Sequence, residues 1–231
     1  MTMEFREFAS RERLDEALAD TVVEMLGRGI SQNGSATLVV SGGSTPLNFF
    51  RLLSALPLAW DRVTVLLADE RWVPPDHSDS NERLVRENLL VGAAAAARFL
   101  PLKTAHDSAE QAEGNVDSIL ATVGRFDLVI LGMGGDGHTA SLFPATTALR
   151  EGLDMASGRQ CLAVTPASAP HQRMSMTLPR LLDSARIFVH ITGTDKKHTL
   201  DLARKKNDPF KLPIAAVLNQ ERTPVTLYYA P

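Results

Sequence analysis

The feature that most constrains this sequence is an alternation between short apolar runs and longer stretches of helical periodicity. Most of the runs are apolar at consecutive positions, as strands buried on both faces require. Strands that alternate with helices form parallel sheets, so the pattern predicts an α/β fold with a mostly parallel sheet and helices on both faces. The predicted strands are residues 36–40, 63–68, 126–131, 161–165, 186–192 and 225–229, with residues 98–102 as a weaker candidate.

Helical spacing is clearest in residues 11–26, where four apolar side chains share one stripe. We expect Gly27 to end this helix as a C-cap, Pro46 to lie in the first turn of the next helix, and Asn81 to cap the third. Further helices are predicted over residues 46–53, 82–90, 109–123, 178–182 and 195–203, and loops over residues 76–80 and 167–172.

Size and composition are those of a globular protein. The chain has 231 residues, of which 44% are hydrophobic and 22% charged. Such a chain can bury one sizeable core, so we expect a single domain over residues 1–231.

Charge and cysteine content narrow the possible partners. The 24 Lys and Arg residues against 27 Asp and Glu give a net charge of -3, which provides no general attraction to nucleic acids or anionic membranes. No apolar run approaches the length of a membrane span, and the single cysteine, Cys161, cannot form an internal disulfide. These features favour a cytoplasmic protein that acts on a small molecule, as a monomer or small homo-oligomer.

The first segment with chemical potential is SGGSTP, residues 41–46, between a predicted strand and a predicted helix. Gly42 and Gly43 allow the backbone to approach a ligand closely, the helix N-terminus presents free amides, and Ser44 and Thr45 add hydroxyl donors. An ordinary tight turn explains the same residues equally well. Because the lysine of a nucleotide P-loop is absent, a monophosphate fits better than a triphosphate.

The second segment is DERWVP, residues 69–74, directly after the strand predicted at 63–68. Charged residues at the carboxyl end of a parallel strand lie where such sheets bind ligands. The three consecutive charges Asp69, Glu70 and Arg71 could hold a hydroxylated, partly anionic substrate, with Arg71 stabilising negative charge on an oxygen. The alternative is a solvated loop with local ion pairs.

The third segment, GMGGDGHTASLFP at residues 132–144, carries most of the information. Its four glycines indicate backbone that is bent or closely approached. His138 emerges from them as a candidate base near neutral pH, and Asp136 is close enough in sequence to influence its tautomer. A glycine-rich strand end is a poor place for core packing, so a functional histidine is favoured over a buried structural one.

This third segment also spells the dinucleotide pattern G-x-G-x-x-G, but Phe143 and Pro144 follow too soon for the long helix that the pattern requires. A kinase-like reading of its Gly-Gly-Asp-Gly leaves the other two segments without a role. Ser141 is not in a G-x-S-x-G elbow and is not expected to be a nucleophile. Arg173 and Lys196 fall at element boundaries where they could close on a phosphate. No Cys or His pair has metal-ligand spacing, so no metal is implied.

The three segments resemble those of the 6-phosphogluconolactonases, within the glucosamine-6-phosphate isomerase/6-phosphogluconolactonase family, in order, approximate spacing and chain length. The resemblance covers most of the chain and is most specific over residues 136–144. The sister deaminases have Tyr at the position of Arg71 and Asn-Glu-Pro where this chain has its Ser-Leu-Phe-Pro ending, which favours the lactonase branch. The family usually has an acidic residue in place of Gly135.

The resemblance implies a Rossmann-like sugar-phosphate isomerase/lactonase fold and hydrolysis of 6-phosphoglucono-δ-lactone to 6-phosphogluconate without a cofactor. It implies that His138 activates water with support from Asp136, that Arg71 stabilises the oxyanion, and that Asp69 belongs to the same catalytic set. The phosphate would be held by Gly42, Gly43, Ser44, Thr45, Arg173 and Lys196. The alternatives are a glucosamine-6-phosphate deaminase/isomerase or a non-catalytic sugar-phosphate sensor, although no segment is left over for an output module.

Overall fold

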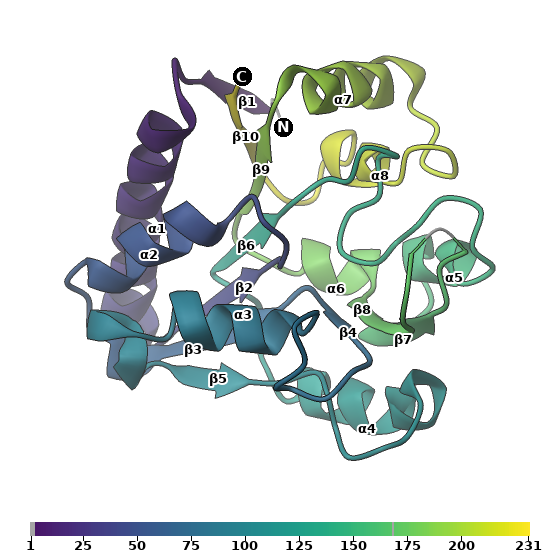
Figure 1. Ribbon diagram of the computed structural model, residues 1–231, viewed down its shortest axis with the longest axis horizontal. Helices are drawn as coiled ribbons and strands as arrows, with labels where there is room; N and C mark the ends of the chain where they lie inside the picture. Colours follow the sequence, from purple (N-terminus) through teal and green to yellow (C-terminus); the bar gives the residue numbers. More distant parts are fainter. Residues whose placement is uncertain (1–2, 168) are drawn as a thin grey trace.

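The computed structural model describes residues 3–167 and 169–231 and contains a central sheet of seven parallel strands (Figure 1). The strand order is β1-β10-β9-β6-β2-β3-β5, and every neighbouring pair is parallel. This confirms the predicted α/β class. The strands are β1 (Glu4–Glu7), β2 (Ala36–Val40), β3 (Val63–Leu67), β5 (Arg98–Leu100), β6 (Leu128–Leu131), β9 (Ile187–Thr192) and β10 (Val225–Ala230).

A second, smaller sheet was not anticipated from the sequence. It is antiparallel, in the order β4-β8-β7, with β4 (Asp69–Arg71), β7 (Cys161–Val164) and β8 (Arg173–Met176). The run at 161–165 is therefore a strand, as predicted, but the prediction that it joins the parallel sheet is wrong. The apolar pattern could not assign β7 to one sheet or the other, because β7 is buried at nearly every position, as the central strands of the parallel sheet are.

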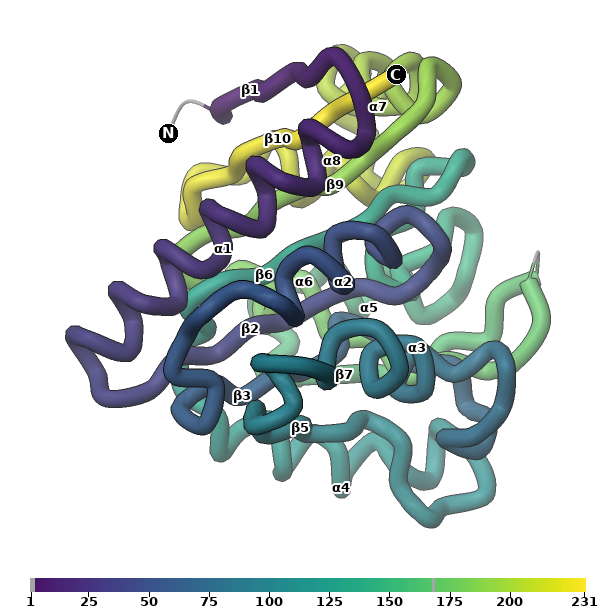
Figure 2. Tube along the Cα trace, turned by 60° about the vertical axis from the view of Figure 1, so that its left-hand side comes forward, coloured from purple at the N-terminus to yellow at the C-terminus, as the bar shows by residue number. Residues whose placement is uncertain are grey.

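Helices cover both faces of the parallel sheet. In Figure 1, α1 (Arg11–Asn33) and α2 (Leu47–Ala55) lie to the left of it, and α6 (Leu178–Leu182) and α8 (Ile214–Leu218) to the right. Figure 2 shows α1 and α2 side by side, consistent with their direct packing. The other helices are α3 (Asn81–Asn88), α4 (Ala109–Ala121), α5 (Leu149–Leu153), α7 (Thr194–Lys206) and two 3-10 turns, η1 (Trp60–Arg62) and η2 (Gly92–Ala96).

Two predicted helix caps are wrong by position. The first helix continues past Gly27 to Asn33 and ends at Gly34, whose φ of 81° is the left-handed conformation that suits a glycine C-cap. The third helix is capped by Ser80, whose hydroxyl accepts the backbone N–H of Arg83, so Asn81 is its first helical residue. In both cases the helix is capped by another residue of a type that favours caps: a later glycine, Gly34, for the first helix, and the preceding serine, Ser80, for the third.

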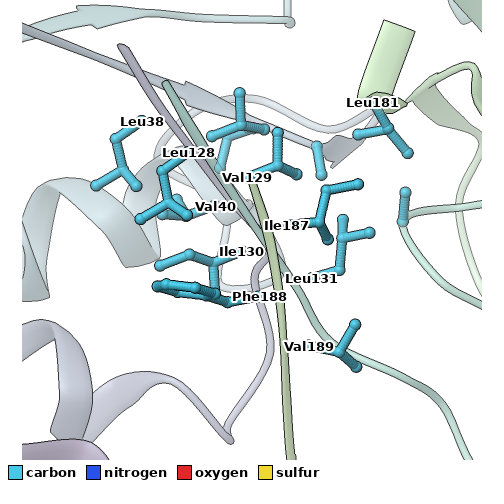
Figure 3. Packing of buried hydrophobic residues seen from close by; sticks show 14 of the residues in the cluster. Leu38, Val40, Leu128, Val129, Ile130, Leu131, Leu181, Ile187, Phe188 and Val189 are labelled. Carbon is cyan, nitrogen blue, oxygen red and sulfur yellow. The ribbon is translucent and has the colours of Figure 1, made fainter. Parts of the chain in front are cut away.

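The core lies on both faces of the central strands, as the consecutive apolar positions predicted. Figure 3 shows Leu38, Val40 and Leu128 on one side of the strands and Leu131, Ile187 and Val189 on the other. All six side chains are fully buried. Cys161 is buried as well, and burial raises the pKa of its thiol to about 12, in agreement with a packing role.

The strand order explains how distant segments meet. Strands β9, β6, β2 and β3 are consecutive neighbours and all parallel, so their carboxyl ends share one edge of the sheet. The chain moves from β2 outward to β3, but β6 joins the opposite side of β2, which makes this edge a topological switch point. Open α/β sheets bind ligands at such points.

Among the residues described, no helix is long and apolar enough to cross a membrane.

Candidate active site

A cavity of about 480 Å³ opens at this edge of the sheet. The sequence predicts ten candidate site residues: Gly42, Gly43, Ser44, Thr45, Asp69, Arg71, Asp136, His138, Arg173 and Lys196. All but Asp136 line the cavity directly, and Asp136 contacts His138. The structure therefore brings the three segments and the two isolated basic residues together.

The turn at residues 41–45 forms one wall of the cavity. Gly43 has a φ of 94°, a conformation that favours glycine. A Cβ on Gly42 would lie 1.9 Å from Oδ1 of Asn81, so close packing with α3 also requires glycine there. The following helix α2 has no side-chain cap, which leaves its N-terminal amides available beside the cavity.

Arg71 and Arg173 are directly opposite each other on β4 and β8 and both face the cavity. Arg71 donates from Nη1 to the carbonyl of Asp79 at 2.6 Å, and Arg173 from Nη2 to the carbonyl of Pro170 at 3.0 Å. Neither forms a salt bridge with any described residue. Burial, followed by the charge of Arg71, lowers the pKa of Arg173. Two adjacent cations without carboxylate partners are suited to hold a phosphate or a carboxylate.

Glu70, on β4 between Asp69 and Arg71, does not line the cavity, so the prediction that all three charges hold the substrate is wrong for this residue. It fixes the loop that follows instead. Its carboxylate accepts the backbone N–H groups of Arg71, Asn81 and Glu82 at 2.6–2.7 Å and the hydroxyl of Ser80 at 3.1 Å. It is 1% exposed, and burial raises its pKa. Glu70 therefore joins β4 to the N-terminus of α3 and holds the loop that contacts Arg71.

The loop after β6 presents His138 to the cavity. Nδ1 of His138 lies 2.6 Å from Oδ1 of Asp136, the same oxygen that accepts the backbone N–H of His138. The bond from His138 lowers the pKa of Asp136, so this carboxylate is ionised and must accept the Nδ1 proton. The Nε2 lone pair is then free to act as a base. The predicted contact between the two side chains is confirmed.

Two glycines, Gly134 and Gly137, are required by the conformation and close packing of the loop after β6. Gly137 has a φ of 79° and packs against Leu212, and its carbonyl accepts the N–H of Ile214 at the start of α8. Gly134 lies directly beneath the His138 ring. On the other side, the ring contacts Phe143, with 4.2 Å between the ring centroids. The imidazole is thus held between a glycine and an aromatic ring.

Asp69 lies at the base of the cavity and is 7% exposed. Its Oδ2 accepts the hydroxyl of the fully buried Ser141 at 2.6 Å, and its carbonyl accepts Nδ2 of Asn81 at 2.9 Å. The Ser141 hydroxyl therefore donates its proton to the Asp69 carboxylate and not to a histidine, which is consistent with the prediction that Ser141 is not a nucleophile.

Lys196 reaches the cavity from the first turn of α7. Burial lowers its pKa, and no described carboxylate pairs with it. His190 on β9 lines the cavity nearby, with Nε2 3.3 Å from Oδ1 of Asp15 on α1. Both members of this pair are almost completely buried.

Sequence reasoning missed four cavity residues, namely Asp79, Asn81, His171 and His190. The first three lie in or beside the predicted loops 76–80 and 167–172, which fold over the same side of the cavity; Ser168 of the second loop lies outside the described residues. His190 was hidden inside a predicted strand. Only its position near the carboxyl end of that strand could have suggested a site.

Comparisons with known proteins identify the family. A model described as glucosamine-6-phosphate isomerases/6-phosphogluconolactonase matches residues 9–226. The chain belongs to this family. A 6-phosphogluconolactonase of Rhizobium meliloti (strain 1021) is 44% identical over 225 residues, 97% of each chain. That of Mesorhizobium japonicum is 46% identical, covering 97% of this chain and 94% of the relative.

Solved structures agree with this membership of the family. The crystal structure of a 6-phosphogluconolactonase from Shewanella baltica OS155 superposes on this member with a TM-score of 0.97 at 39% identity, covering 100% of this chain and 98% of the other. The resemblance that the three segments indicated is confirmed, and so is the fold that it implied.

Proposed function

We propose that this chain hydrolyses 6-phosphoglucono-δ-lactone to 6-phosphogluconate, the second step of the oxidative pentose phosphate pathway. The observation that carries the proposal is that an oriented His138–Asp136 pair shares one cavity with the glycine turn and the two unpaired arginines. A base and several anion-binding groups in one cavity fit a phosphorylated substrate with a reactive carbonyl.

In the proposed mechanism, His138 acts through Nε2. It removes a proton from a water molecule as the water oxygen bonds to the lactone carbonyl carbon, and the carbonyl oxygen becomes an oxyanion. Arg71 stabilises that oxyanion. When the bond between the carbonyl carbon and the ring oxygen breaks, the protonated His138 returns its proton to the departing oxygen. Asp136 keeps the imidazole in the required tautomer and stabilises its charged form throughout.

The phosphate is assigned to the glycine turn and to two of the cations that line the cavity. Gly42 and Gly43 with the amides of α2, the hydroxyls of Ser44 and Thr45, and the cations of Arg173 and Lys196 supply its ligands. Asp69 is assigned to the sugar hydroxyls, because its carboxylate lies in the cavity and retains acceptor capacity beyond its bond to Ser141.

The test is the rate of 6-phosphogluconate formation from freshly generated lactone, coupled to 6-phosphogluconate dehydrogenase. Wild type, His138→Ala and a control without enzyme are compared, because the lactone also opens unaided. His198→Ala, which removes an exposed histidine of α7 away from the cavity, is the matched control. We expect His138→Ala to fall by at least about a hundredfold while still folded, and His198→Ala to match wild type.

A wild-type rate equal to that of the enzyme-free control would refute the proposal. Ammonia release from glucosamine 6-phosphate then tests the deaminase alternative, and phosphosugar binding without turnover tests the sensor. The single domain over residues 1–231, the cytoplasmic location, the monomer or small homo-oligomer and the absence of nucleic-acid partners stay predictions from the sequence.

A further inference from the structure

Three side chains capable of binding a metal meet at the mouth of the cavity. His77 and Asp79 belong to the loop between β4 and α3, and His171 to the loop before β8. One ligand atom of each lies within 4.8 Å of the ligand atoms of the other two. Nε2 of His171 is 2.9 Å from Oδ2 of Asp79, and the rings of His77 and His171 meet edge to face with centroids 5.4 Å apart.

The chemistry of this donor set selects the metal. Two imidazoles and one carboxylate form a set that Zn²⁺ and Co²⁺ take readily, with a fourth position left for water. Tetrahedral bonds of about 2.0–2.1 Å place ligand atoms roughly 3.4 Å apart. The Asp79–His171 contact is already shorter than this, so only His77 has to approach. A metal would take the place of the proton that Asp79 and His171 now share.

We propose that His77, Asp79 and His171 form a site for a divalent transition metal of the zinc type, and that metal bound there inhibits the enzyme. The inhibition follows from position. Asp79 and His171 line the cavity on opposite loops, and the carbonyl of Asp79 holds Arg71. A metal that joins these loops fixes the entrance to the cavity and restrains Arg71, because the carbonyl and the ligating carboxylate belong to the same residue.

The surroundings set the strength of the site. His77 accepts the backbone N–H of Asp79 through Nδ1 at 3.0 Å, and ligation through either nitrogen of this ring requires giving up that bond. The charges of Arg71 and Arg173 also lie close by and disfavour a second cation. The site is therefore expected to bind metal reversibly.

The first experiment measures binding without reference to turnover. The full chain is titrated with Zn²⁺ against a chromophoric chelator, and separately with Co²⁺ while the visible absorption is recorded. We expect one metal per chain and the intense bands of four-coordinate Co²⁺. His77→Ala and His171→Ala should each weaken Zn²⁺ binding by at least about tenfold. His198→Ala, with its exposed histidine on another element, should bind as wild type.

The second experiment links binding to activity. His77 does not line the cavity, so His77→Ala should have the wild-type rate without metal. It should nevertheless resist Zn²⁺ at concentrations that inhibit wild type, and a chelator should restore the wild-type rate. A stable fold is verified for each variant by thermal unfolding.

Three results would overturn the proposal. They are the absence of Zn²⁺ binding to wild type, equal binding by wild type and both variants, and loss of binding in His138→Ala but not in His77→Ala, which would place the metal on the catalytic pair. Because metal binding is measured without substrate, the proposed metal site is tested independently of the lactonase activity.

Discussion

Gly134→Ala tests whether the position of the His138 ring controls the reaction. A Cβ on Gly134 would lie 2.2 Å from both Cε1 and Nδ1 of His138 and 2.8 Å from Oδ1 of Asp136. Ordinary contact begins near 3.4 Å. The backbone of Gly134 does not have a positive φ, so alanine is accepted there without backbone strain. The added methyl group therefore acts on the His138–Asp136 pair, and most strongly on the imidazole.

The size of the effect follows from these distances. To relieve the overlap, the ring must recede by about 1 Å, and a displacement of that size at a reacting group costs about a hundredfold in rate. The ring is 29% exposed on one side, so it can turn outward into solvent. We expect the free energy of unfolding to change by less than about 1 kcal/mol, since no core packing is lost.

Gly135→Ala is the matched control. The neighbouring glycine also lacks a positive φ, and a Cβ there would meet nothing within 4 Å. It should retain the wild-type kcat/KM in the coupled lactonase assay, with thermal unfolding as the check on folding. If folded Gly134→Ala keeps more than half of the wild-type kcat/KM, or if Gly135→Ala loses as much activity as Gly134→Ala, the reasoning fails.

Three further predictions concern groups around the cavity. Asp136→Asn should lower kcat by between about a hundredfold and ten-thousandfold through the wrong His138 tautomer. Because its pKa is lowered, any stability that wild type gains from Asp136 should be present above about pH 3.8 and lost as the pH falls through the lowered value, which denaturant unfolding across pH measures. Glu70→Gln should reduce the free energy of unfolding by about 1–3 kcal/mol and raise KM, because an amide nitrogen would face backbone N–H donors. An unchanged midpoint of unfolding in urea would contradict this prediction. Arg173→Met should raise KM for the phosphorylated lactone by at least about tenfold and change the turnover of unphosphorylated glucono-lactone little. The variant should unfold at the wild-type temperature or above; a lower unfolding temperature would contradict this by showing that the guanidinium stabilises the fold.

The part of the fold that could be predicted is the part governed by periodicity. Strands β2, β3, β6 and β9 are apolar at nearly every position, and such short runs bounded by turn residues are typical of strands buried on both faces. The site segments followed directly, since chemically distinctive residues stand at the carboxyl ends of these strands.

Two of the missed strands have sequences that give no such signal. Strand β1, with the sequence EFRE, is mostly exposed at the sheet edge, so no apolar pattern marks it. Strand β4 consists of Asp69, Glu70 and Arg71, three charged residues that typify a loop. It forms because Glu70 receives four donors and because the backbone pairs with β8, and neither contact is visible in sequence.

The same reasoning explains why the site was predictable as a set of residues but not as an arrangement. Arg71 and Arg173 are a hundred positions apart, and only the antiparallel pairing of β4 with β8 makes them adjacent. The pairing concentrates positive charge in a protein whose net charge is -3, and burial is the main cause that lowers the pKa values of Arg173 and Lys196. Such groups cost stability in the empty protein, and a phosphorylated ligand offsets that cost when it binds. The small second sheet thus places two cations on neighbouring strands where both line the same cavity, which the parallel sheet alone does not do.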